Sequence, residues 1–300
     1  MSTRITPLST TASMLADLNA GRRALDEVQR RVASGKRLQQ VSDSPAEAVT
    51  SLDHRSRLRR SEQLGRNAAV ATRWLNEADR ALSTAVDRLN AARTALVQAT
   101  SGANDQTSRL ALANQIRALR ESLLETANTS IAGRPILGGT SASPAAYAPD
   151  GTYQGDTGTV SLPISAGVTM TVAATGPQVF GTANATDPAN GDVFQQLDAL
   201  ATAVQNGDIA AIQAGLGQID AATTRVQSVQ VQLGSRSAQL SDLRAAAAAS
   251  DQELTSAISD IEDTDLAEAT IQLKSREVAY QASLQVTARV IQLSLMDFLR

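Results

Sequence analysis

Residues 75–99 read LNEADRALSTAVDRLNAARTALVQA, and this stretch decides the fold class. Leucine and alanine recur along it at alternating spacings of three and four residues, at Leu75, Ala78, Leu82, Ala85, Leu89, Ala92, Leu96 and Ala99. This spacing places a narrow apolar stripe along one side of a long helix, and such a stripe needs a partner helix to cover it. The stretch therefore predicts a mainly α protein whose long helices pack side by side.

The last third of the chain carries a second stripe with the same register, at Ile209, Ile212, Leu216, Ile219, Val226, Leu233 and Leu240. Six of the eight prolines lie from Pro135 to Pro188, whereas 46–134 and 189–300 contain none. Both proline-free stretches are far longer than an average helix of about 11–12 residues. We expect an N-terminal arm at 45–134 and a C-terminal arm at 193–260 to form an elongated antiparallel bundle or coiled coil.

Residues 135–192, between the two arms, differ in kind. They are rich in Gly, Pro, Thr and Ser and contain short runs in which apolar and polar residues alternate. Residues 160–164 and 168–172 have the pattern of strands, and Ser165-Ala-Gly167 between them is typical of a hairpin turn. We predict a small β-rich insertion that the helical bundle carries.

Capping patterns mark the ends of two further helices. Gly35 is predicted to end a first helix, because glycine readily adopts the positive φ of a helix stop. Ser44, Pro45 and Glu47 predict a helix start, with Ser44 as N-cap and Glu47 completing a capping box. Asp265 and Glu268 form a similar pattern before the last helix. These ends delimit terminal segments at 1–44 and 261–300.

The terminal segments carry apolar residues at heptad-like spacing, namely Leu8, Leu15, Leu18, Leu25 and Val32 in the first and Leu284, Ile291 and Phe298 in the last. A helix at the membrane surface needs a cationic face, which the single Arg289 between 278 and 299 does not provide. The two ends therefore pair either with each other alone or also with other copies. We favour other copies, because two helices cannot cover stripes this wide, and we predict these eight residues as an assembly interface.

The composition excludes several kinds of chemistry. The chain has no cysteine and one histidine, which rules out thiolate nucleophiles and cysteine-ligated metals, and we expect no cofactor and no metal. Two carboxylate pairs, Asp43 with Glu47 and Asp263 with Asp265, lie at predicted helix starts. Acidic residues stabilise the N-terminal end of a helix, so we interpret both pairs as caps rather than as an acid and a base. The sequence does not predict an enzyme.

The net charge of −3 at pH 7 conceals an uneven distribution. Residues 1–134 hold 20 basic and 13 acidic side chains, and residues 193–300 hold 7 basic and 13 acidic ones. A basic cluster at 55–60 is flanked by Asp53 and Glu62 and has no aromatic residue nearby, so we interpret it as a solvated or subunit-facing surface rather than a nucleic-acid site. No apolar run reaches the roughly 18 residues of a membrane span. The opening residues lack the apolar core of a signal peptide, so we expect neither a membrane anchor nor a cleaved signal.

Six motifs in order along the chain resemble the bacterial flagellin superfamily. They lie at 34–45, 128–139, 153–180, 233–236, 261–268 and 280–298. Within the superfamily they are most similar to the hook–filament junction branch, since Ser42-Asp-Ser-Pro45 stands where filament flagellins usually carry Asp-Asp-Ala, and Tyr153-Gln-Gly-Asp156 resembles the β-domain of the junction branch.

This resemblance implies a structural role outside the cell, in the flagellum. Proteins of the branch form a ring of identical subunits between hook and filament, with flagellin on one side and the first hook-associated protein on the other. They are exported through the flagellar type III apparatus, and a dedicated export chaperone binds near their C-terminus. By analogy, the two terminal segments form an inner tube, the two arms a rod-like shell, and residues 135–192 an outer domain. The alternatives are a filament flagellin and, from another class, a coiled-coil scaffold protein.

Overall fold

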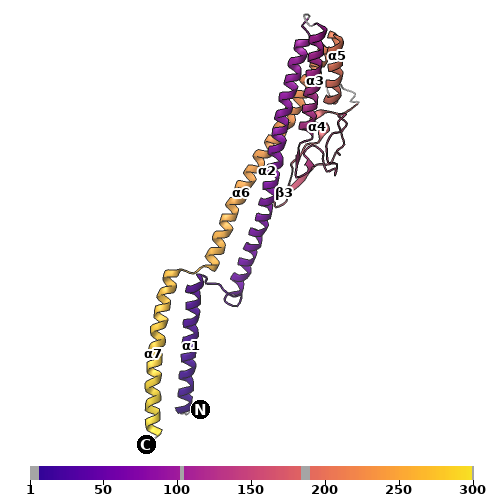
Figure 1. Ribbon diagram of the computed structural model, residues 1–300. Helices are drawn as coiled ribbons and strands as arrows, with labels where there is room; N and C mark the ends of the chain where they lie inside the picture. Colours follow the sequence, from indigo (N-terminus) through magenta and orange to yellow (C-terminus); the bar gives the residue numbers. More distant parts are fainter. Residues whose placement is uncertain (1–6, 102–104, 184–189, 299–300) are drawn as a thin grey trace. The chain divides into compact units, whose positions relative to one another are not determined.

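The computed structural model describes residues 7–101, 105–183 and 190–298. Long helices dominate it, and two short hairpins and a five-residue helix lie between them (Figure 1). The elements are α1 (Pro7–Ser34), α2 (Pro45–Ala99), α3 (Gln106–Ala127), β1 (Ser130–Ile131), β2 (Arg134–Pro135), β3 (Ser161–Ser165), β4 (Val168–Thr171), α4 (Gly176–Phe180), α5 (Val193–Asn206), α6 (Ile209–Glu262) and α7 (Leu266–Phe298). A mainly α fold with a small β insertion, as predicted from the stripes and the prolines, is confirmed.

The chain divides into two compact units. The terminal unit comprises Met1–Arg59 and Ser250–Arg300, and the bundle unit comprises Arg60–Ala249. Both α2 and α6 contribute residues to each unit.

The bundle unit is built on the stripe at 75–99. All eight of its leucines and alanines are buried in one hydrophobic core, and Trp74 beside them is also buried. The C-terminal stripe joins the same core through Ile212, Ile219, Val226, Leu233 and Leu240. Ile209, at the first position of α6, is instead 40% exposed.

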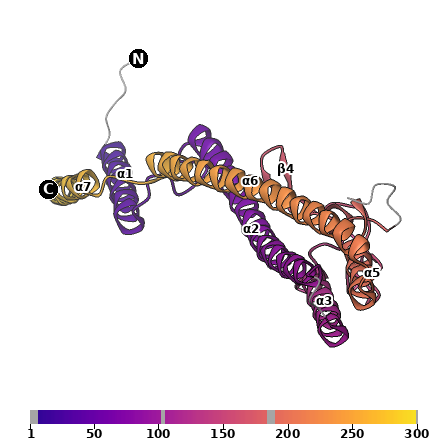
Figure 2. The ribbon, with the colours of Figure 1, turned by 90° about the horizontal axis from the view of Figure 1, so that it is seen from above.

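The N-terminal arm is not one continuous run of helix. The chain reverses after α2, and α3 runs back beside it and packs against α5 (Figures 1 and 2). Asp105 caps the start of α3 by accepting a hydrogen bond from the Ser108 amide at 2.8 Å. The apolar residues at 116–123, which continue the register of α2 in the sequence, therefore belong to a second helix of the bundle.

The C-terminal arm is also divided. Gly207 ends α5 in the left-handed conformation, with a φ of 74°, and its N–H donates to the carbonyl of Val204. An αL glycine is a frequent helix stop, because it has no Cβ to clash with the backbone. The two parts of this arm thus form separate helices on either side of a tight turn.

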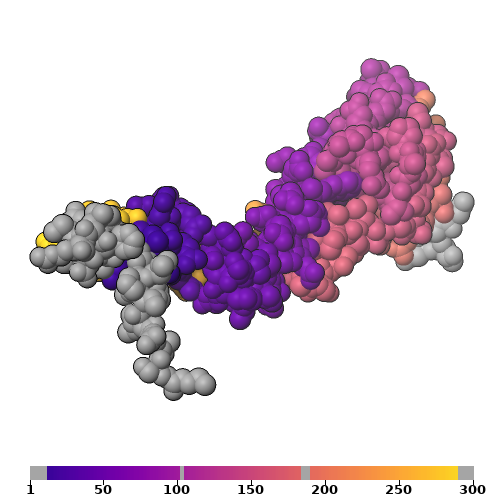
Figure 3. All heavy atoms as spheres, turned by 90° about the horizontal axis from the view of Figure 1, so that it is seen from below, coloured from indigo at the N-terminus to yellow at the C-terminus, as the bar shows by residue number. Residues whose placement is uncertain are grey.

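Within the bundle unit, the insertion packs on the helices (Figure 3). An aromatic cluster lies in the core that they share. Strands β3 and β4 pair antiparallel, with Gly167 at a φ of 76° in the turn between them. Tyr147 lies against Tyr153 and Phe194 with ring centroids 5.2 and 4.9 Å away, and Phe180 completes the cluster. Three aromatic rings of the insertion therefore pack together with Phe194 of α5.

Polar contacts fasten the insertion to the helices. Arg120 of α3 is buried, donates to the carbonyls of Pro149 and Asp150, and pairs with Asp198 of α5 at 2.9 Å. Asp192 is buried at the N-cap of α5, where burial raises the pKa of its carboxyl above the ordinary value. These contacts hold the insertion against α3 and α5, the two helices between which it lies in the sequence.

Candidate assembly interface

Helices α1 and α7 lie side by side and form the described part of the two chain ends (Figures 1 and 2). Apart from Ala24 and Arg31, the residues of α1 that are buried or half-buried follow alternating spacings of four and three, at Met14, Leu18, Gly21, Leu25, Val28 and Val32. Such spacing is that of a helix whose stripe faces a single partner. Val28 is the most deeply covered of them, at 7% exposure.

Residues of α7 meet this stripe from the other helix. Ala269 is buried, and Leu273 and Tyr280 are half-buried. The ring of Tyr280 lies against Gly21, where an added Cβ would stand 3.6 Å from Tyr280 Cδ2. The ring of Tyr280 therefore lies at an ordinary packing distance from α1 at Gly21.

The opposite side of α7 carries exposed apolar residues, with the polar residues Lys274 and Ser275 between them. Ile271 and Val278 are 71% and 56% exposed and lie one heptad apart. Each precedes a stripe residue, Leu273 or Tyr280, by two positions, which on an α-helix is a rotation of about 200°. Helix α7 therefore presents apolar side chains on two opposite sides, and α1 covers one of them.

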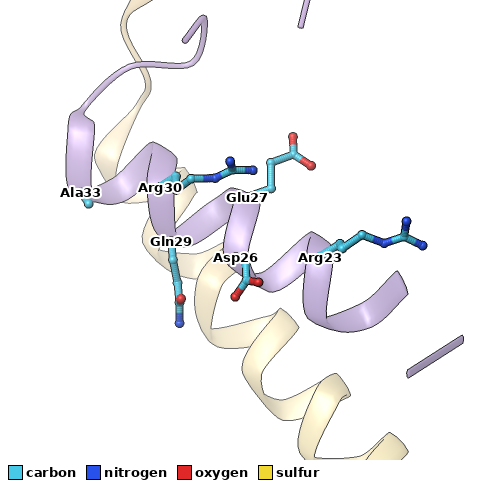
Figure 4. A pocket seen from close by; sticks show the side chains of 6 residues that line it. All are labelled: Arg23, Asp26, Glu27, Gln29, Arg30 and Ala33. Carbon is cyan, nitrogen blue, oxygen red and sulfur yellow. The ribbon is translucent and has the colours of Figure 1, made fainter. Parts of the chain in front are cut away.

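The outer surface of α1 is different in character. A shallow hollow there is lined by polar and charged side chains and one alanine, at Arg23, Asp26, Glu27, Gln29, Arg30 and Ala33. Arg23, Glu27 and Arg30 project from the same side of the helix (Figure 4). The exposed apolar surface of the pair thus belongs chiefly to α7.

The predicted interface residues fall into three groups. Leu18, Leu25 and Val32 lie in the stripe between α1 and α7 and are half-buried. Leu15 and Leu284 are 51% and 42% exposed. Leu8, Ile291 and Phe298 belong to α1 and α7 by their backbone, and their side chains lie outside the described part of the structure.

The sequence analysis missed the residues that mark the two sides of the pair, Met14, Val28, Ile271, Val278 and Tyr280. The signal for the first two was present, because Met14 and Val28 complete an unbroken register with Leu18, Leu25 and Val32. Ile271 and Val278 are also one heptad apart, but a lone heptad does not show which side a partner covers.

The predicted helix ends lie where α1 stops and where α2 and α7 start. Gly35 follows α1 with a φ of 66°, and its N–H donates to the carbonyl of Arg31 at 2.9 Å. Helix α2 begins at Pro45, and the Ser44 carbonyl accepts the first helical hydrogen bond, from Ala48. The Glu47 carboxylate accepts two hydrogen bonds from the guanidinium of Arg37, which lowers its pKa.

The start of α7 follows the same logic. The Asp265 carboxylate accepts hydrogen bonds from the amides of Ala267 and Glu268, at 2.8 and 3.2 Å. Glu268 itself lies in the first turn of α7, where a negative charge favours the helix dipole. Asp265 thus caps the start of α7, and Glu268 adds a favourable charge to its first turn.

One buried charge at this place was not predicted. Glu262, the last residue of α6, is 4% exposed, and its carboxylate pairs with Arg55 of α2 at 2.5 Å and with Lys36 of the α1–α2 linker at 3.4 Å. Ser51 of α2 also donates to it. Burial alone would raise the pKa of Glu262, but the hydrogen bonds from Arg55, Ser51 and Lys36 outweigh burial and lower it.

Asp263 adds a second ion pair at the same place. Its carboxylate accepts from Lys36 and from Ser259, and these hydrogen bonds lower its pKa. The same bond to Asp263 raises the pKa of Lys36 above its ordinary value. Asp263, which the sequence analysis interpreted as part of a helix cap, therefore belongs to a network of opposite charges.

Two helical ends around a central insertion form the architecture of a known family. The N-terminal helical region of bacterial flagellin matches residues 5–142, and the C-terminal helical region of bacterial flagellin matches residues 216–299. Together these matches cover most of the chain, and the chain belongs to the bacterial flagellin family.

Within that family the chain is similar to a hook-associated protein. It is 27% identical over 232 residues to flagellar hook-associated protein 3 of Salmonella typhimurium, with 71% of this chain and 73% of that protein covered. The chain is a structural component of the bacterial flagellum and is not an enzyme.

Solved structures share the fold. A candidate flagellar hook-associated protein of Vibrio parahaemolyticus superposes with a TM-score of 0.67 at 19% identity, over 74% of this chain and all of the other. The flagellar junction protein FlgL of Legionella pneumophila superposes with a TM-score of 0.58 at 16% identity, over 71% of this chain and 100% of the other. Among the described residues, no helix has the length and apolar character needed to cross a bilayer.

Proposed function

We propose that this protein forms a ring of identical subunits at the junction between the flagellar hook and filament, held together by α1 and α7. One observation carries the proposal: α7 exposes Ile271 and Val278 on the side opposite the stripe that faces α1. Each buried apolar side chain contributes roughly 1.5–3 kcal/mol, so an uncovered row of them favours association with a further helix. The helices of neighbouring subunits are the partners that the proposal assigns to this row.

The proposed arrangement follows the division of the chain. Segments 1–44 and 261–300 form the inner part of the assembly, arms 45–134 and 193–260 its shell, and residues 135–192 an outer domain. Leu8, Leu15, Leu284, Ile291 and Phe298 belong to the assembly interface in this arrangement, together with Ile271 and Val278.

The partners and the route follow from kinship with hook-associated protein 3. We propose flagellin on one side of the ring and the first hook-associated protein on the other. An export chaperone binds the C-terminal region before the flagellar type III apparatus exports the chain to the outside of the cell. The charge difference between residues 1–134 and 193–300 supports contact between unlike faces of neighbouring subunits.

Charged substitutions on the exposed side of α7 test the ring. Ile271→Asp and Val278→Asp place a charge where a neighbour is proposed to pack, so we expect export to continue and junctions and motility to be lost. Gln272→Asp is the matched control, because it adds the same charge at an exposed polar position of the same helix. Normal junctions in both variants, seen by immunogold labelling of isolated hooks and filaments, contradict the proposal.

A filament subunit is the second candidate, because the matching helical regions are those of flagellin. Purified protein seeded with filament fragments separates the two. A junction subunit adds at the seed end and stops, whereas a filament subunit grows long filaments.

A further inference from the structure

We propose that Glu262 is the positioning residue that fastens the α1–α2 linker to the end of α6 and so holds α1 and α7 together as a pair. The inference concerns the single chain, and only its consequence for assembly rests on the proposed function.

The Glu262 carboxylate accepts hydrogen bonds from two separate segments of the terminal unit. Arg55 and Ser51 reach it from one side of α2, and Lys36 reaches it from the linker. Because the carboxylate is 4% exposed, water does little to replace a lost donor. Removing one partner of such a buried ion network is far more costly than removing a surface pair.

Backbone hydrogen bonds place the linker on the same residue. The Glu262 carbonyl accepts from the amides of Arg37 and Leu38, at 2.6 and 3.3 Å, and the Ile261 carbonyl accepts from the Arg37 guanidinium at 2.7 Å. The Thr264 amide donates to the Gly35 carbonyl at 3.0 Å. Backbone and side-chain hydrogen bonds therefore join the residues that follow α1 to the residues that precede α7.

This joint matters because the α1–α7 contact is thin. Among the described side chains of the two helices, the hydrophobic ones with less than a tenth of their surface exposed are Val28 and Ala269. An isolated helix pair with so little buried surface opens readily in water. The network at Glu262 brings the ends of both helices to one point, so it lowers the entropy that the pairing of α1 and α7 must overcome.

Hydrogen exchange of the purified full-length monomer tests the inference. Glu262→Gln keeps the size and removes the charge, and Arg55→Gln removes one of its donors. Both are expected to speed amide exchange at least about tenfold in 12–34 and 266–289, with 60–99 and 209–249 unchanged, because local opening and global unfolding are separate events. Arg57→Gln is the matched control, since Arg57 makes only an exposed pair with Asp53 within α2.

The double variant Arg55→Gln with Glu262→Gln adds a coupling measurement. If the two residues act through one contact, the double variant speeds exchange little more than Glu262→Gln alone. Exchange in α1 and α7 that stays within about twofold of the Arg57→Gln control overturns the inference, as does equal acceleration in both units. Failure of the ring proposal leaves these monomer measurements unaffected, so the two are distinguishable.

Discussion

At the scale of residues, Gly215 and Gly217 lie two positions apart in α6 and have opposite surroundings. A Cβ built on Gly215 would stand 2.0 Å from Cδ2 of Leu200, a buried residue of α5. A Cβ on Gly217 meets no atom within 4 Å. The first glycine is required by packing, whereas the second merely weakens its helix.

Alanine at these two glycines separates the two effects. Gly217→Ala is expected to stabilise the bundle unit by about 0.5–1 kcal/mol, because glycine in a helix interior loses more entropy on folding than alanine. Gly215→Ala gains the same propensity but overpacks Leu200, which costs about 1–3 kcal/mol. Thermal or urea unfolding should therefore rank Gly217→Ala above wild type and Gly215→Ala below Gly217→Ala. Equal stability of the two variants contradicts the described packing.

The pKa shifts at Glu262 and Lys36 predict how the joint responds to pH. The folded pKa of Glu262 is lowered, so its stabilisation is full above the ordinary value of 4.5 and is lost as pH falls through the folded value. The folded pKa of Lys36 is raised, so its contribution is full below the ordinary value of 10.5 and is lost as pH rises through the folded value. Asp263, whose pKa is also lowered, adds to the loss in acid.

Protection factors of amides in α1 and α7, corrected for the intrinsic effect of pH on exchange, measure this response. At pH 7 we expect the wild type to be better protected than Glu262→Gln. The difference is expected to disappear as the solution is acidified below 4.5. A difference that grows in acid means that the Glu262 carboxylate does not stabilise the joint.

Residues differ in how far the sequence determines their place. The buried state of Leu82 and Leu89 follows from local spacing alone, because every third or fourth position of a helix shares one side. The burial of Glu262 does not, because its donors lie more than 200 positions away and a charged helix end is usually solvated. Tertiary ion pairs have no local pattern by which a single sequence reveals them.

At the scale of elements, the start of α2 at Pro45 and the β3–β4 hairpin were predicted from capping and turn residues. The reversal between α2 and α3 was not, because the apolar register resumes after the polar residues 101–105. Periodicity reports which side of a helix is buried and carries no information about the direction of the next helix. The α5–α6 turn had a local signal in Asn206-Gly207, which the long stripe after it obscured.

The pairing of α1 with α7 makes a prediction at this scale. Val28→Asp places a charge in the buried stripe, so we expect amide exchange in 12–34 and 266–289 to accelerate at least about tenfold while the bundle unit keeps its melting temperature. Leu15→Asp is the control, because Leu15 is 51% exposed on the same helix. Equal exchange in the two variants contradicts the described stripe.

At the scale of the whole molecule, the bundle unit buries a continuous hydrophobic core, whereas the terminal unit leaves apolar residues of α7 uncovered. We propose that such a chain folds its bundle alone and completes its ends in contact with other molecules. The sequence analysis predicted terminal segments at 1–44 and 261–300, whereas the terminal unit also takes in residues of α2 up to Arg59 and of α6 from Ser250. It did not identify Ile271 and Val278, because which side of α7 stays open depends on where α1 packs.

Thiol labelling at position 278 tests this account most directly, because the chain has no cysteine of its own. A Val278→Cys variant is treated with a maleimide both as purified monomer and within intact flagella, with Gln272→Cys as reference for solvent access. The account predicts fast labelling of Cys at 278 in the monomer and at least about tenfold slower labelling in the flagellum, since the neighbouring subunit covers it. Labelling at the monomer rate in assembled flagella contradicts the account, because the apolar side of α7 is then open to water after assembly.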